Sequence, residues 1–177
     1  MIHLIMLKEV EIKRSKVVNI FKKEWFQITL LTLLSISAPL IIKSPQILVG
    51  SIVNFTLTFS VLRLGFKKTL PSVIFPSLFA YGSNILFGGA TFFLIYFLPI
   101  IFVGNAVYIL LIKSLKLNIF NILISSFCKS IILFLFAYIF VNHFNFPSMF
   151  LSSMGYMQLI TAVIGGYIGF FLNKVSV

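Results

Sequence analysis

Lys129 is a charged residue at a position where a charge is costly. It is the only charged side chain between Ile119 and Val141. At about 1.5 Å of rise per helical residue, it lies roughly 15 Å from either end of that run. A lysine at such a depth costs roughly 2.5–3.5 kcal/mol on membrane-insertion scales. Its ammonium group therefore indicates polar partners in the protein, a water-filled cavity, another subunit or an anionic ligand.

Large polar side chains also interrupt other apolar segments of the chain. Polar groups in hydrocarbon usually face the interior of a helical bundle. They either join helices through hydrogen bonds worth around 1 kcal/mol or less, or they line a binding cavity. Asn84, near one end of its segment, can instead face water. The candidate binding residues are Asn54, Tyr81, Asn84, Asn105, Lys129 and Gln158.

The acidic residues argue against catalysis. All three, Glu9, Glu11 and Glu24, precede the first long apolar segment, and no Asp or Glu lies between Trp25 and Val177. Carboxylate proton relays and acid–base pairs within the apolar segments are thereby excluded. The only histidines are His3 and His143, and no acid lies near His143 to orient it for Ser/His hydrolysis. We therefore expect a protein that is not an enzyme and that uses no cofactor.

Metal binding is also disfavoured. The single cysteine, Cys128, excludes a disulfide within the chain and a multi-cysteine metal site. The Met1-Ile2-His3 start offers a free amino group and an imidazole, which can chelate nickel or copper. However, the basic residues that follow predict a cytoplasmic location for this end, and no second ligand cluster follows. We expect no metal site.

The composition is that of an integral membrane protein. Of the 177 residues, 60% are hydrophobic and only 10% are charged, with a mean hydropathy of +1.13. The net charge of +11 falls mainly at the ends of apolar segments, where it sets topology, so it does not indicate nucleic-acid binding. The lipid bilayer is the expected environment.

The apolar segments predict an all-α bundle of six transmembrane helices within residues 26–172. Twelve Lys and Arg residues fall on one side of these spans, whereas Lys43 is alone on the other. The positive-inside rule therefore predicts that both termini are cytoplasmic. Pro71 is expected in the first turn of the third span, and Pro76 and Pro99 are expected to kink the third and fourth. The predicted spans are Phe26–Ile42, Gln46–Leu62, Thr69–Phe87, Thr91–Ile112, Ile119–Val141 and Met154–Leu172.

Short segments flank the predicted bundle. Residues 1–25 carry six Lys or Arg and place Val10, Val17, Phe21 and Trp25 roughly on one helical face. This pattern predicts a basic amphipathic helix on the membrane surface. It is not typical of a signal peptide, because the charges follow the apolar stretch. Initiation at Met6 is an alternative to Met1, and residues 173–177 form a short cytoplasmic tail.

Small residues form a face on the last span. Gly165 and Gly169 make a GxxxG pair, with Ala162 and Gly166 beside it. Such faces allow helices to approach closely. They serve either packing within the bundle or docking of a partner subunit.

The order of motifs resembles the substrate-binding S components of energy-coupling factor (ECF) transporters, over residues 46–172. These are six-span membrane proteins of about this size with cytoplasmic termini. The likeness lies in "LVGSIVNFTLTFSVLRLG", "PSLFAYG", "LPIIFVGNAVYILL", "CKSIILFLFAY" and "QLITAVIGGYIGFFL", which follow one another along the chain.

The resemblance implies a subunit of a bacterial or archaeal plasma membrane that binds a small vitamin-like or other micronutrient solute from outside. It would dock on an ECF coupling transmembrane protein driven by two cytoplasmic ATPases, since this chain has no phosphate-binding loop. A cavity in the outer half would be lined by the candidate residues, with Lys129 facing an anionic solute. However, helical side chains lean toward their helix's N-terminus, which favours a position for Lys129 nearer the cytoplasm.

The docking surface departs from the family pattern. Many S components dock through an Ala-xxx-Ala face on their first helix, but here that helix reads "FQITLLTLLSISAPLII". Docking is expected to use Thr32, Ser35 and Ala38, or Gly165, Gly166 and Gly169. The alternative function is a non-transporting scaffold subunit of a cell-envelope or cell-shape complex, which requires a packed interior without a ligand cavity.

Overall fold

The computed structural model describes residues 23–42, 45–115 and 118–175, which contain helices and no strands. The predicted surface helix covers residues 1–25. Of these, residues 1–22 lie outside the described part, as do Lys43 and the last two residues, whereas Glu24 and Trp25 belong to the first long helix. The elements are α2 (Glu24–Ile41), α3 (Gln46–Leu64), α4 (Phe66–Ser83), the 3-10 helix η1 (Gly88–Phe93), α5 (Leu94–Ser114), α6 (Ile119–Phe144), α7 (Met149–Met154) and α8 (Tyr156–Val175).

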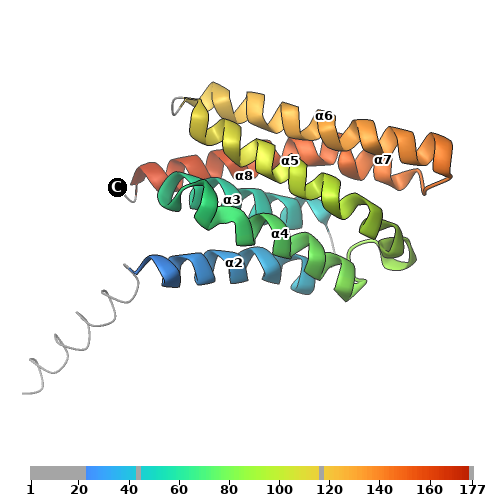
Figure 1. The fold of residues 1–177 in the computed structure, drawn as a ribbon, viewed down its shortest axis with the longest axis horizontal. Coiled ribbons are helices and arrows are strands. Elements are labelled where there is room, and N and C mark those ends of the chain that lie inside the picture. Colours follow the sequence, from blue (N-terminus) through green and yellow to red (C-terminus); the bar gives the residue numbers. More distant parts are fainter. Residues whose placement is uncertain (1–22, 43–44, 116–117, 176–177) are drawn as a thin grey trace, which may run out of the picture.

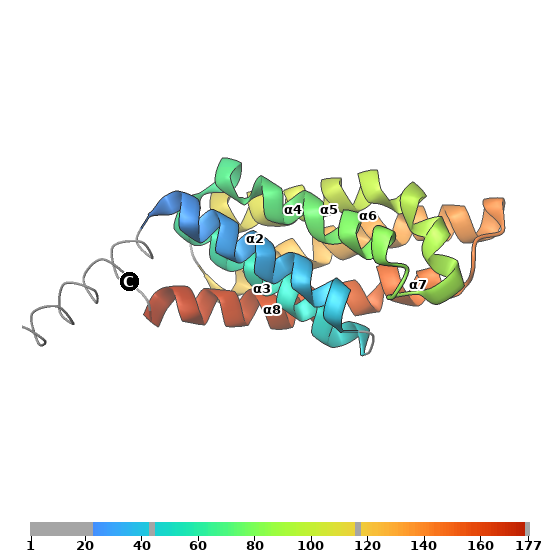
Figure 2. The same ribbon diagram turned by 90° about the horizontal axis from the view of Figure 1, so that it is seen from below.

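The long helices lie side by side and alternate in direction (Figures 1 and 2). Glu24 at the start of α2 and Val175 at the end of α8 lie at the same end of the bundle (Figure 1). We call this the basic end, since its described residues include Lys67, Lys68, Lys113 and Lys174. The other end, where α7 and η1 lie, is called the distal end.

The distribution of side chains is that of a multi-pass membrane protein. Within the described residues, five helical segments are long and apolar enough to cross a membrane: Glu24–Ile41, Gln46–Leu64, Gly88–Ser114, Ile119–Phe144 and Met149–Val175. Large apolar side chains such as Leu33, Val103 and Phe127 are exposed on the surface, whereas Ser35 and Thr56 are fully buried. This arrangement suits a bundle whose solvent is lipid, where polar groups must find partners inside the protein.

The third predicted span is shifted relative to α4. Gly65, with φ +84°, adopts a backbone conformation that other residues rarely take, and it joins α3 to α4 without a longer loop. As a result α4 begins at Phe66, and Pro71 lies inside the helix rather than in its first turn. The helix ends at Ser83 because Asn84 takes the left-handed conformation that often terminates helices.

A break at Gly155 lies at the start of the last predicted span, Met154–Leu172. The short helix α7 ends at Met154 and α8 starts at Tyr156. A Cβ atom at Gly155 would lie 2.6 Å from Leu151 O and 2.9 Å from the Phe134 ring, so a larger residue does not fit. The Gly155 carbonyl accepts a hydrogen bond from Ser130 Oγ at 2.9 Å, which ties this break to α6.

The glycine face of α8 packs within the bundle. A Cβ at Gly165 would meet Ser51 O and would lie 2.6 Å from Phe55 N, and one at Gly169 would lie 3.0 Å from Phe55 O. These glycines therefore let α8 approach the backbone of α3 directly. A Cβ at Gly166 would lie 2.6 Å from the Tyr108 hydroxyl on α5.

Candidate binding cavity

The residues predicted for partner docking are buried within the bundle. Gly165, Gly166 and Gly169 are buried against neighbouring helices. Thr32, Ser35 and Ala38 are likewise buried on α2, and Thr32 Oγ1 shares a hydrogen bond of 3.2 Å with Ser72 on α4. Small residues allow close helix contact, and here the contacting helices belong to the same chain.

A cavity of about 90 Å³ lies between the middle of the bundle and its distal end. Residues from α2 to α6, from the α4–η1 connection and from α7 and α8 contribute to its lining. Four of the six candidate residues lie around it: Asn54, Asn105, Lys129 and Gln158. The sequence predicts a cavity in the outer half of the bundle, which is the distal half if the basic end is cytoplasmic.

Tyr81 and Asn84 do not belong to the cavity lining. Asn84 is exposed, because it forms the left-handed C-cap of α4. Tyr81 is half-buried and packs against the apolar cluster at the distal end. Tyr81 lies in the last turn of α4 and Asn84 lies just beyond it. The predicted span continues to Phe87, whereas α4 ends at Ser83, and this earlier helix end places both residues away from the cavity.

Lys129 is 2% exposed and finds its partner on another helix. Its Nζ donates a hydrogen bond of 2.6 Å to Asn54 Oδ1 on α3. The Asn54 amide is held in turn, since Nδ2 donates to Gly50 O at 2.8 Å and to Thr161 Oγ1 on α8 at 3.3 Å. Asn54 therefore links α3, α6 and α8 and fixes the ammonium group beside the cavity.

Tyr108 supports Lys129 from α5, although sequence reasoning did not place it in the site. Lys129 Nζ lies 5.3 Å from the centroid of the Tyr108 ring, within the range of a cation–π contact. The Tyr108 hydroxyl donates to Ala162 O at 2.9 Å and shares a 2.9 Å hydrogen bond with Thr58 Oγ1. Its spacing of three residues from Asn105, on one helical face, is the signal that could have identified it.

Asn105 has one satisfied and one unsatisfied polar atom. Its Nδ2 donates to Val73 O on α4 at 3.3 Å. Its Oδ1 is buried and has no hydrogen-bond partner among the described residues. Rotating the amide by 180° would set an oxygen against the Val73 carbonyl, so this bond fixes the orientation. An unpaired buried acceptor is uncommon in a folded protein.

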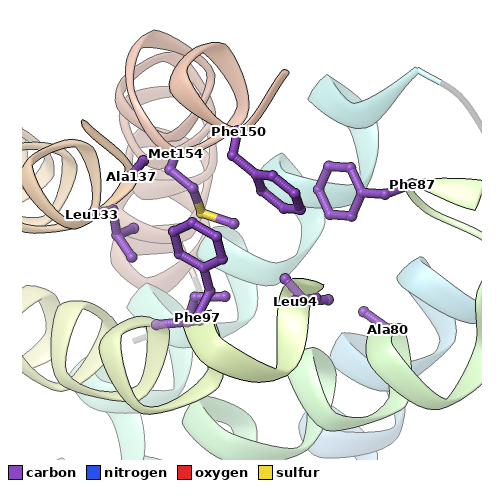
Figure 3. Close-up of a cluster of buried hydrophobic side chains, with 9 residues drawn as sticks. Ala80, Phe87, Leu94, Phe97, Leu133, Ala137, Phe150 and Met154 are labelled. Carbon is purple, nitrogen blue, oxygen red and sulfur yellow. The ribbon is translucent and has the colours of Figure 1, made fainter. Parts of the chain in front are cut away.

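The distal half of the cavity is apolar and partly aromatic. Ala80, Phe87, Leu94 and Met154 line it and also belong to the buried cluster drawn in Figure 3. The rings of Phe87 and Phe150 lie beside one another, with centroids 5.4 Å apart and their planes tilted by 43° (Figure 3). Phe87 comes from the connection before η1, where no helical periodicity announces it in the sequence.

Polar side chains also occur in the more accessible part of the lining. Gln46, Ser77 and Gln158 are all half-buried. Gln46 Oε1 accepts a hydrogen bond from Ser153 Oγ at 3.2 Å, which joins the start of α3 to α7. The cavity thus combines an interior cation, several amides and apolar walls. This is the composition of a pocket that orients a small molecule through a few polar contacts.

The lining contains no acid, histidine or cysteine. Among the described residues, no group of three or more His, Cys, Asp or Glu is placed to hold a metal ion. The groups present support binding through charge and hydrogen bonds.

No protein-family model, curated protein or solved structure matches this chain.

Proposed function

We propose that this chain is the substrate-capture subunit, or S component, of an ECF-type importer, and that it binds a small vitamin-like or other micronutrient solute in the cavity beside Lys129. The observation that carries this proposal is the buried Lys129 beside a cavity that is also lined by Asn105, whose buried Oδ1 has no hydrogen-bond partner among the described residues. A protein whose interior served packing alone would gain stability from apolar residues at these positions.

The proposed orientation follows from the basic residues. Their concentration at one end favours that end as cytoplasmic. The distal end then faces the outside, and the cavity receives the solute from there. The resemblance in motif order supports the same orientation.

The proposed partners are an ECF coupling transmembrane protein and two cytoplasmic ATPases. Because the expected small-residue faces are buried, docking would use exposed apolar positions of the bundle instead. The test is purification of the tagged full chain from native membranes in a mild detergent. Co-isolation of the coupling protein with both ATPases supports the proposal. Stable association with envelope-assembly proteins, and with no ATPase, contradicts it.

One observation favours the scaffold alternative. Asn54 Oδ1 gives the Lys129 ammonium a partner within the chain, so the lysine is tolerated without a ligand. A scaffold predicts that Lys129→Met leaves partner association unchanged and that no solute accompanies the purified chain. The capture subunit predicts a bound solute that the same substitution removes.

A further inference from the structure

The charge around the cavity is unbalanced. Among the described residues that line the cavity, Lys129 is the only ionisable side chain, and no acid follows Glu24 in the sequence. Glu24 itself pairs with Lys68 at the basic end, at 2.5 Å. A buried cation without a counter-charge is costly, and a ligand with one negative charge removes that cost. A cation would add repulsion, and a dianion would leave a buried negative charge.

Lys129 has donors available for such a ligand. An ammonium group carries three N–H donors. In the described part of the chain its hydrogen-bond acceptor is Asn54 Oδ1. Because Asn54 is held by two hydrogen bonds of its own, the ammonium stays at the cavity edge. A carboxylate oxygen can accept from the remaining donors in a charge-assisted hydrogen bond.

Asn105 adds a second requirement. Its Oδ1 is an acceptor, its orientation is fixed by Val73 O, and it is unpaired within the described residues. Only a hydrogen-bond donor satisfies it. A ligand that meets both residues therefore carries an O–H or N–H group in addition to its negative charge.

The size and walls limit the rest of the ligand. The cavity volume of about 90 Å³ is smaller than the ~150 Å³ cavity that accommodates benzene. Ala80, Leu94 and Ile101 present apolar surface between the polar groups. The remaining body of the ligand is therefore apolar and only a few carbon atoms long.

From these constraints we infer that the cavity takes a short-chain monocarboxylate bearing a hydroxyl or amino donor, with its carboxylate on Lys129 Nζ and its donor on Asn105 Oδ1. This inference rests on the proposed solute-binding function and narrows its substrate class. It assigns charge recognition to Lys129 and recognition of the donor to Asn105.

The test is calorimetric titration of the purified full chain in lipid nanodiscs with three probes of similar shape. Propionate carries the charge alone, propionamide is its neutral counterpart, and lactate adds a hydroxyl donor. Propionate should bind about ten- to a hundredfold more tightly than propionamide. Lactate should bind about three- to tenfold more tightly than propionate, since it adds one hydrogen bond.

Two variants separate the two contacts. Lys129→Met should abolish the preference of propionate over propionamide. Asn105→Leu should remove the advantage of lactate over propionate while keeping the preference for a carboxylate. The melting temperature of each variant is measured beside that of the parent. If it is lower, the binding constants are compared after correction for the folded fraction, so that a loss of binding is not confused with unfolding.

The outcomes also separate this inference from the proposed function. Equal binding of propionate and propionamide, or no binding of either carboxylate below about 10 mM, overturns the inference. If a neutral or cationic solute co-purifies instead, the capture function stands and the monocarboxylate assignment fails. If lactate binds as expected but no coupling protein associates with the chain, the assignment stands and the ECF function fails.

Discussion

Replacing Asn54 with leucine should expose the cost of leaving the buried Lys129 ammonium without its acceptor. The change removes the 2.6 Å hydrogen bond from Lys129 and the 3.3 Å bond to Thr161. A hydrogen bond to a charged group contributes about 1.5–3 kcal/mol, and a neutral interhelical bond in a membrane protein contributes about 0.6 kcal/mol. The expected loss in the free energy of unfolding is therefore about 2–4 kcal/mol.

A double-mutant cycle isolates the contact between the two residues. In the Asn54→Leu single variant the Lys129 ammonium lacks its acceptor, whereas in the Asn54→Leu/Lys129→Met double variant the ammonium is absent as well. Its destabilisation should be smaller than the sum of the single changes by about 1.5–3 kcal/mol. The free energies are measured by unfolding in mixed micelles of mild detergent and sodium dodecyl sulfate, followed by circular dichroism.

Asn142 provides a matched control for the loss of an asparagine. It lies exposed on α6, and its Nδ2 donates only within its own helix, to Tyr138 O at 2.9 Å. Asn142→Leu should change the free energy of unfolding by less than about 0.5 kcal/mol. Additivity of the Asn54 and Lys129 changes within about 0.5 kcal/mol would refute the pairing of these two side chains.

Three further predictions concern the bundle. Gly165→Ala should lower the free energy of unfolding by about 1–3 kcal/mol, because the added Cβ would clash with the backbone of α3. The control Gly82→Ala, where the added Cβ would meet nothing within 4 Å, should be neutral or slightly stabilising in the same unfolding assay. Equal effects of the two substitutions would contradict the close α3–α8 contact. Tyr108→Phe should cost about 1 kcal/mol through its lost hydroxyl bonds but should keep the ring beside the ammonium, so stability falls while ligand affinity is retained. Reporter fusions at Lys43–Ser44 and at His143 should report a location outside the cytoplasm, and a cytoplasmic signal at either position would contradict the proposed orientation.

Much of the cavity's polar lining could be anticipated from the sequence. Asn54, Asn105, Lys129 and Gln158 each interrupt an apolar helix, and the cost of burying them in lipid requires that they face inward. Inward-facing groups on adjacent helices then gather around the same interior space. The high proportion of hydrophobic residues likewise predicts an integral membrane protein, because lipid-facing surfaces must be apolar.

Other features depend on contacts between segments that are distant in the sequence. Nothing in the sequence around Gly165 tells whether its small face meets α3 or another protein, and the internal contact proved to be the one formed. Phe87 reaches the cavity from an irregular connection, whose path depends on the helix end at Ser83 and on packing against Phe150. Periodicity describes helices and gives no position for such a residue.

The short helix α7 before Gly155 was missed for a similar reason. The predicted span begins at Met154, which is the last residue of α7, and it runs through Gly155 without a break. The break is stabilised by Ser130 Oγ, which donates to Gly155 O from α6. A tertiary hydrogen bond of this kind leaves no local signal.

The most direct test of a solute bound beside Lys129 is to identify what the protein carries. The full chain and its Lys129→Met variant are purified from native membranes in parallel, brought to equal folded concentration and denatured, and the released small molecules are measured by mass spectrometry. We predict that one solute is released near one molecule per chain from the parent and is depleted at least tenfold in the variant. Release of no solute from the parent, or of the same solute in equal amount from both proteins, would contradict the proposed binding at Lys129.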